Sequence, residues 1–217
     1  MAEFYIFDMD GTLVDNDCDV SWKLFLVAAG FAPEGDAALA HKYYDDYAEG
    51  VLDLDEFLRF QLREFVGHTK AEMAKICQRH FDEFVRSKCR PGAIEETRRV
   101  AASGKPSTIL SSTNTMISEP VRAFFGIKET AGPTLELDGS GRFTGRLAGD
   151  YTLGPQKVVR MRQMAQRLGV SPDDIAAYGD SAADIPLLSS VGHPFVVAPS
   201  PELRAEAEKR GWPILEW

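Results

Sequence analysis

Apolar and polar positions along this chain follow two different patterns. Residues 3–7 form a short apolar run, which predicts a buried strand. No convincing strand follows between residue 15 and about residue 89. In that stretch, apolar residues recur at helical spacing, most clearly where Asp53 precedes Leu54, Phe57 and Leu58 as a helix N-cap. We therefore expect a compact insertion of four helices, near residues 20–30, 36–49, 54–65 and 69–86.

From Pro91 onward, helix-like and strand-like segments alternate. Strands are expected at 107–110, 174–178 and 195–197, and a β-hairpin at 134–145 turns at Asp138-Gly139. Strands separated by helices of this length imply a parallel, doubly wound sheet. The predicted fold is therefore α/β, with a Rossmann-like core of residues 1–14 and 90–217 and an all-helical insertion of residues 15–89.

Composition and charge exclude several classes of protein. The 217 residues are 44% hydrophobic and carry a net charge of −9, which argues against nucleic acid as a partner. No apolar stretch approaches the ~20 residues that span a bilayer, and we see no signal peptide. The three cysteines lack metal-like spacing and suggest free thiols in the cytoplasm. The sequence does not indicate an oligomeric state.

The first predicted strand ends in a pair of carboxylates. Asp8 and Asp10 lie two residues apart, so they emerge together at the carboxyl end of the strand, where α/β sheets bind ligands. Two carboxylates at one place repel unless a cation or a proton lies between them. Gly11 allows the chain to turn sharply just after them. The alternative interpretation is a plain Asp-rich turn.

Other candidate residues follow later strands or open later helices. Ser111 ends the strand at 107–110, Asp180 and Asp184 follow the strand at 174–178, and Lys157 opens a helix. Right-handed crossovers place all strand carboxyl ends on one edge, so these side chains can converge. Simpler roles remain open, because Ser111 fits an ST-turn, Lys157 a solvated helix start and Asp184 a helix cap.

These motifs, in this order, resemble those of the haloacid dehalogenase superfamily. The resemblance rests on Asp8-Met9-Asp10-Gly11-Thr12, on Ser111 after Thr108-Ile109-Leu110, on Lys157, and on the segment from Gly179 to Asp184. The helical insertion is similar to that superfamily's C1 cap. Tyr178-Gly179-Asp180-Ser181 and the segment from Trp22 to Leu26 are similar to the phosphoserine-phosphatase-like branch, subfamily IB.

The resemblance implies a Mg²⁺-dependent phosphatase. Asp8 would attack phosphorus and form an aspartyl phosphate, and Asp10 would act as the general acid and base. Mg²⁺ would be held by Asp8, the backbone carbonyl of Asp10, and Asp180.

The resemblance also implies how the phosphoryl group is bound. Ser111 and the backbone N–H groups near Met9 and Ser112 would donate to its oxygens. Lys157 would neutralise its charge. Asp184 would position Lys157 or a metal-bound water.

The substrate class follows only from the branch. A small phosphorylated metabolite is expected, with phosphoserine, histidinol phosphate or another amino-alcohol phosphate favoured. A phosphotransferase or mutase, and a phospho-accepting binding module, are the alternatives. Five residues of the insertion are further candidates. Asp15, Asp17 and Asp19 either attract a substrate amine or belong to a solvated hinge. Arg59 and Arg63 would meet a substrate carboxylate if their helix lines the cleft.

Overall fold

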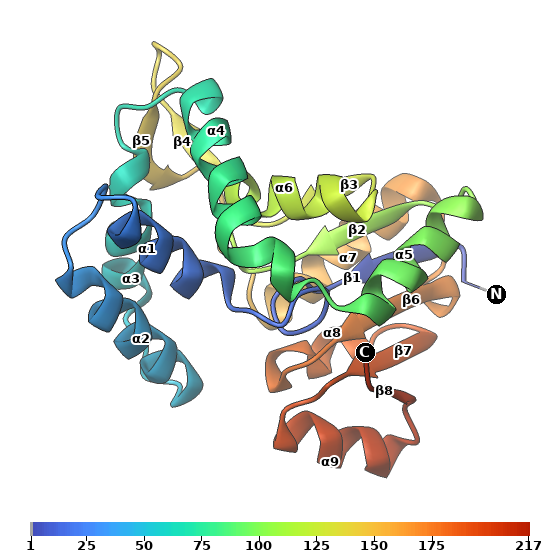
Figure 1. Cartoon of the computed structure of the whole chain (residues 1–217). Coiled ribbons are helices and arrows are strands. Elements are labelled where there is room, and N and C mark those ends of the chain that lie inside the picture. The colour runs from blue at the N-terminus through green and yellow to red at the C-terminus, as the bar shows by residue number, and fades with distance from the viewer. Residues whose placement is uncertain (1) are drawn as a thin grey trace.

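The computed structural model describes residues 2–217 and contains a six-stranded, fully parallel sheet (Figure 1). Its strand order is β3-β2-β1-β6-β7-β8. The order reverses around β1, which lies at the centre between β2 and β6. The strands are β1 (Phe4–Phe7), β2 (Ser107–Leu110), β3 (Glu129–Ala131), β6 (Ile175–Gly179), β7 (His193–Val197) and β8 (Ile214–Leu215).

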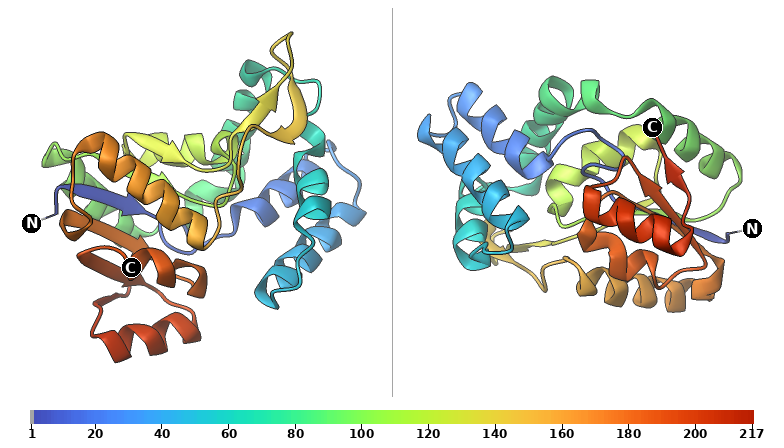
Figure 2. Two further views of the ribbon diagram at one scale, coloured as in Figure 1. Left: turned by 180° about the vertical axis from the view of Figure 1, so that it is seen from behind. Right: turned by 90° about the horizontal axis from the view of Figure 1, so that it is seen from below.

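Helices cover both faces of this sheet, because β1 is apolar on both sides. Tyr5 and Phe7 pack toward one face, whereas Phe4 and Ile6 pack toward the other. Figure 1 shows α5 on the near side, and the view from behind in Figure 2 shows the orange helix α7 on the opposite side. The first face is covered by α5 (Pro91–Ala102) and α6 (Thr115–Phe125), and the second by α7 (Pro155–Leu168), α8 (Ile185–Leu188) and α9 (Pro201–Arg210).

The insertion after β1 is helical, as predicted. We call residues 15–89 the cap. Side chains fix the helix starts: Asp17 and Asp53 accept from backbone N–H groups, and Thr69 forms a capping box with Glu72. The helices are α1 (Cys18–Ala28), α2 (Gly35–Ala48), α3 (Leu54–Leu62) and α4 (Lys70–His80), and α4 continues as a π-helical turn, Phe81–Val85.

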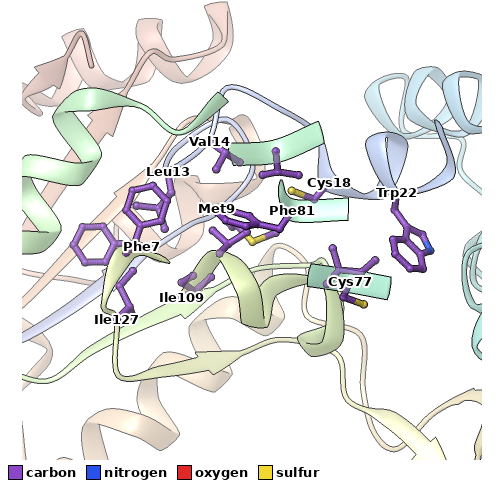
Figure 3. Packing of buried hydrophobic residues seen from close by; sticks show 14 of the residues in the cluster. Phe7, Met9, Leu13, Val14, Cys18, Trp22, Cys77, Phe81, Ile109 and Ile127 are labelled. Atoms are coloured by element: carbon purple, nitrogen blue, oxygen red, sulfur yellow. The ribbon is translucent and has the colours of Figure 1, made fainter. Parts of the chain in front are cut away.

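One apolar cluster continues from the sheet into the cap. Figure 3 shows Phe7 and Met9 at one end, Phe81 and Cys77 beyond them, and Trp22 at the cap end. These five side chains are at most 1% exposed. The cap is therefore packed onto the core through α1, α4 and the π-helical turn.

The hairpin of β4 (Leu135–Leu137) and β5 (Phe143–Leu147) lies against the cap rather than on the main sheet (Figures 1 and 2). Gly67 donates its N–H to the Phe143 carbonyl at 2.9 Å, and Phe143 donates to the His68 carbonyl at 2.9 Å. The Phe143 ring packs edge-on against Phe65. These two hydrogen bonds thus stabilise the cap by joining residues that are 75 and 76 positions apart in sequence.

The predicted fold class is confirmed, with additions at the sheet edges. Neither β3 nor β8 is among the predicted strands. Glu129–Ala131 pairs with β2, and Ile214–Leu215 pairs with β7. No helix within residues 2–217 is both long and apolar enough to cross a membrane.

Candidate active site

Three strand ends meet at the carboxyl edge of the sheet. Asp8 follows β1, Ser111 follows β2 and Asp180 follows β6. All three line one cavity of about 370 Å³, together with Asp10 and Lys157. The topology therefore brings together residues from four distant parts of the sequence, as the strand-end pattern predicted.

Lys157 links two carboxylates beneath this cavity. It lies in the first turn of α7, where Pro155 begins the helix. Its ammonium group donates to Asp184 Oδ1 at 2.7 Å and lies 2.8 Å from Asp8 Oδ2. Lys157 is 2% exposed. The interpretation of Lys157 as a solvated residue at a helix start is therefore wrong.

Asp184 has two sets of partners. One oxygen accepts from Lys157, whereas Oδ2 accepts from the backbone N–H groups of Asp180 and Ser181 at 3.2 Å each. It therefore fixes the loop after β6, as a capping residue does, and also orients Lys157. Its side chain makes no capping hydrogen bond to α8, so the interpretation of Asp184 as the cap of that helix is wrong.

Gly11 is required by the close approach of Asp180. Its φ is +72°, and a Cβ at this position would lie 2.1 Å from Asp180 Oδ2. Thr12, the next residue, donates its hydroxyl to Asp180 Oδ1 at 2.9 Å. The turn after β1 thus holds the carboxylate that follows β6.

The Asp10 carboxylate is bound from the cap side. Its Oδ1 accepts from the Cys18 backbone N–H at 2.8 Å, and its Oδ2 accepts from the Thr113 hydroxyl at 2.7 Å. The same hydroxyl lies 3.4 Å from Asp19 Oδ2. Asp10 therefore lies between the start of α1 and the loop after β2, where cap and core meet.

Of the residues expected to bind a phosphoryl group, Ser111 and Ser112 line the same cavity, whereas Met9 does not. Ser111 is buried, and its Oγ accepts from the Thr113 N–H at 3.1 Å, so the ST-turn interpretation also holds. Ser112 lines the cavity beside it. The Met9 backbone N–H donates to Asp8 Oδ1 at 2.8 Å.

The site carries unbalanced negative charge. Burial, together with repulsion from Asp184, raises the pKa of Asp8 to about 7. Burial and the charge of Asp8 raise the pKa of Asp180 to about 8. Burial, with Asp17 nearby, also raises the pKa of Asp10 well above its usual value. Burial lowers the pKa of Lys157, but Asp184 and Asp8 outweigh that effect and raise it.

The donor set fits a divalent cation. Asp8, Asp180 and Asp184 each offer a carboxylate oxygen within 4.8 Å of the others. Hard divalent ions prefer such oxygen ligands. Three carboxylates face the single ammonium group of Lys157, so a second positive charge would balance them.

Acidic and aromatic residues of the cap line the site on the side opposite the sheet edge. Asp17, Asp19, Tyr44 and Tyr47 line the main cavity and also a smaller one between α2 and α3. Burial, and then Asp17, raise the pKa of Asp19 to about 7. Asp15 is exposed and pairs with Arg90 at 2.9 Å.

Arg59 and Arg63, the two arginines expected to meet a substrate carboxylate, line neither cavity. Arg59 is exposed, and Arg63 pairs with Asp36 and Glu64. Within residues 2–217, Lys157 is the only cationic residue that lines either cavity.

Sequence reasoning missed two hydroxyl groups at the site. Thr12 and Thr113 donate to Asp180 and Asp10. Both belong to the polar segments that follow predicted strands, so their positions carried the same signal as Asp8 and Ser111. They were overlooked because neither residue type is itself a nucleophile or a base at an unperturbed pKa.

Comparisons with known proteins agree with this geometry. Residues 5–189 match the haloacid dehalogenase-like hydrolase family. The chain is 33% identical to the histidinol-phosphatase of Neisseria meningitidis over 221 residues, which cover 100% of both proteins. It is 28% identical to the phosphoserine phosphatase SerB1 of Mycobacterium tuberculosis over 216 residues, covering 97% of this chain and 70% of SerB1. A crystal structure of a protein with unknown function from Bordetella pertussis is similar with a TM-score of 0.87 and 29% identity, covering 100% of this chain and 99% of that one.

Proposed function

This chain belongs to the haloacid dehalogenase-like hydrolases and is a phosphatase, and we propose that it hydrolyses a small amino-alcohol phosphate with Mg²⁺ through a phosphorylated Asp8. One observation carries the proposal. Asp8 lies at the end of the central strand, with Lys157 2.8 Å from its Oδ2 and Asp180 and Asp184 beside it. This is the arrangement that in-line attack on a phosphate ester needs, because the nucleophile and the compensating charges share one cavity.

In the first step, an Asp8 oxygen forms a bond to phosphorus while the bond from phosphorus to the substrate oxygen breaks. Asp10 gives its proton to the leaving alkoxide. The Cys18 N–H and the Thr113 hydroxyl hold the Asp10 carboxyl group at the cap boundary during this transfer. Lys157 offsets the charge of the phosphoryl oxygens, and Ser111 lies within the same cavity to donate to one of them.

In the second step, water attacks the phosphorus of the aspartyl phosphate. Asp10, now ionised, takes the proton of that water, and the bond between phosphorus and Asp8 breaks. Inorganic phosphate leaves, and both carboxyl groups return to their starting states.

Mg²⁺ would be held by Asp8, Asp180 and the backbone carbonyl of Asp10. It would supply the positive charge that a phosphate dianion needs near an anionic nucleophile. Thr12 and Gly11 keep Asp180 in place for this task, and Asp184 keeps Lys157 beside Asp8.

The cavity favours histidinol phosphate over phosphoserine. Phosphoserine carries a carboxylate next to its amine, and Lys157, the only cation that lines the described cavities, is needed for the phosphoryl group. Asp17 and Asp19 instead offer negative charge to an amine. The full-length relative named histidinol-phosphatase supports the same choice.

The three cysteines, Cys18, Cys77 and Cys89, are free. Free thiols support the further proposal that this phosphatase works in the reducing environment of the cytoplasm.

Phosphate release from p-nitrophenyl phosphate in Mg²⁺ tests the nucleophile. We expect Asp8→Asn to abolish release, whereas Asp55→Asn, at an exposed carboxylate in the first turn of α3 that lines neither cavity, should keep it within about twofold. Activity of Asp8→Asn near the wild-type rate would contradict the mechanism. Product analysis with a competing alcohol separates hydrolysis from phosphoryl transfer, since a transferase would phosphorylate that alcohol. A stable phosphoprotein without turnover would indicate a binding module.

A further inference from the structure

The smaller cavity has the shape of a side pocket on the catalytic one. It measures about 50 Å³ and shares five lining residues with the larger cavity, namely Asp17, Asp19, Tyr44, Tyr47 and Ser112. A single water needs roughly 10–15 Å³. The side pocket therefore has room for a group of about four or five heavy atoms, the size of a five-membered ring.

Gln61 presents an unpaired acceptor among the residues of this pocket. Its Nε2 donates to the Asp19 carbonyl at 2.9 Å and to Asp19 Oδ1 at 2.8 Å. Because both partners are acceptors, the amide nitrogen must face Asp19, and the oxygen must point elsewhere. Within residues 2–217 no group donates to Oε1, although Gln61 is only 2% exposed. A buried acceptor without a donor is unfavourable, so this atom is suited to an N–H group of a ligand.

Six aromatic side chains line the pocket, together with the aliphatic Val20, Ala40 and Leu52. Tyr43 packs against Phe57 and Phe60, with ring centroids 5.7 and 5.2 Å apart, and all three line the pocket. Tyr151 lines it from the core side. Flat apolar walls of this kind suit a planar ring, and they offer little to a small polar group.

We propose that Gln61, oriented by Asp19 and surrounded by these aromatic side chains, forms a subsite for a five-membered heteroaromatic ring that carries an N–H donor. The inference rests on the proposed function, because the side pocket adjoins the cavity in which the phosphoryl group would lie beside Asp8. The imidazole of histidinol phosphate has the required size, planarity and N–H group. Phosphoethanolamine has the same amine and phosphate but no ring, so it isolates the contribution of the side pocket.

The test compares kcat/KM for histidinol phosphate and phosphoethanolamine in the wild type and in Gln61→Met. Methionine has a similar length but no acceptor oxygen. We expect the wild type to prefer histidinol phosphate at least tenfold and Gln61→Met to lose most of that preference through KM. Phosphoethanolamine turnover should fall by a smaller factor, because that substrate has no ring, although its amine also faces the Asp19 that Gln61 orients. Gln78→Met, on the exposed face of α4, is the matched control and should change neither value.

A second variant and a binding measurement keep the subsite testable if Gln61→Met folds poorly or if turnover is absent. Leu52→Trp fills the side pocket without removing a polar group, and it should abolish the same preference. NMR titration of the wild type should show histidinol binding at least tenfold more tightly than ethanolamine. Equal affinity for the two alcohols, or a preference that survives both variants, would overturn the subsite. Turnover of p-nitrophenyl phosphate reports separately on the proposed phosphatase chemistry.

Discussion

Gly11→Ala tests whether the turn after β1 positions Asp180. The added Cβ would lie 2.1 Å from Asp180 Oδ2, whereas ordinary contacts begin at 3.4 Å. Either the Asp180 carboxylate or the turn must therefore move by about 1.3 Å, and a misplacement of about 1 Å at a reacting site costs on the order of 100-fold in rate. We expect kcat/KM to fall by about that factor, and the Mg²⁺ concentration for half-maximal activity to rise.

Gly104→Ala is the matched control for this prediction. Gly104 has a φ of +71°, almost the same as Gly11, but nothing lies within 4 Å of the position that an added Cβ would take. Both variants bear the cost of a left-handed alanine, about 1–2 kcal/mol. Urea unfolding should show this loss in both, and phosphate release from p-nitrophenyl phosphate should fall only in Gly11→Ala.

Two outcomes would refute the reasoning. If Gly11→Ala kept the kcat/KM and Mg²⁺ dependence of Gly104→Ala, the close approach to Asp180 would have no functional role. If Gly104→Ala lost activity as strongly as Gly11→Ala, the effect would reflect backbone strain in general.

Three further predictions concern a buried ammonium group, a buried imidazole and the metal ion. Lys157→Gln leaves Asp8 and Asp184 without their cation, so its free energy of unfolding without Mg²⁺ should fall by roughly 3–5 kcal/mol in urea titrations. The exposed Lys42→Gln is the control and should leave the free energy of unfolding nearly unchanged. Burial lowers the pKa of His80 to about 3, so the native state binds fewer protons than the unfolded chain below pH 6.5. The free energy of unfolding of the wild type should therefore decrease by about 2 kcal/mol between pH 6.5 and pH 5 because of this residue. His80→Gln should not show this decrease, and equal pH dependence of unfolding in the two proteins would contradict the prediction. Chelation by EDTA should stop phosphate release and added Mg²⁺ should restore it, and release that continues in EDTA would argue against the metal.

The core of the candidate site was predictable because each part has a local signal. Asp8, Ser111 and Asp180 each follow a buried strand, and the parallel order of the strands places strand ends together. Strand β3 carried no such signal, since Glu129-Thr130-Ala131 is short and half-buried at an edge. The two-residue strand β8 forms only because β7 offers a partner.

The side pocket was not predictable, because it depends on tertiary packing. Tyr43 lies on α2, and Phe57 and Phe60 lie on α3, where their spacing indicates only an apolar helix face. Gln61 in the same helix has the appearance of a solvent-facing residue. Its partner Asp19 is 42 positions away, so the contact follows from how α1 and α3 meet.

The hairpin of β4 and β5 has a consequence for protein engineering. Gly67 and His68 exchange backbone hydrogen bonds with Phe143, and Arg142 donates to the Gly67 carbonyl. Transplanting residues 15–89 alone onto a related scaffold would sever these bonds and bare the Phe65 ring. A chimaera that is meant to keep the cap intact must therefore carry two separate segments, the cap before β2 and the hairpin after it.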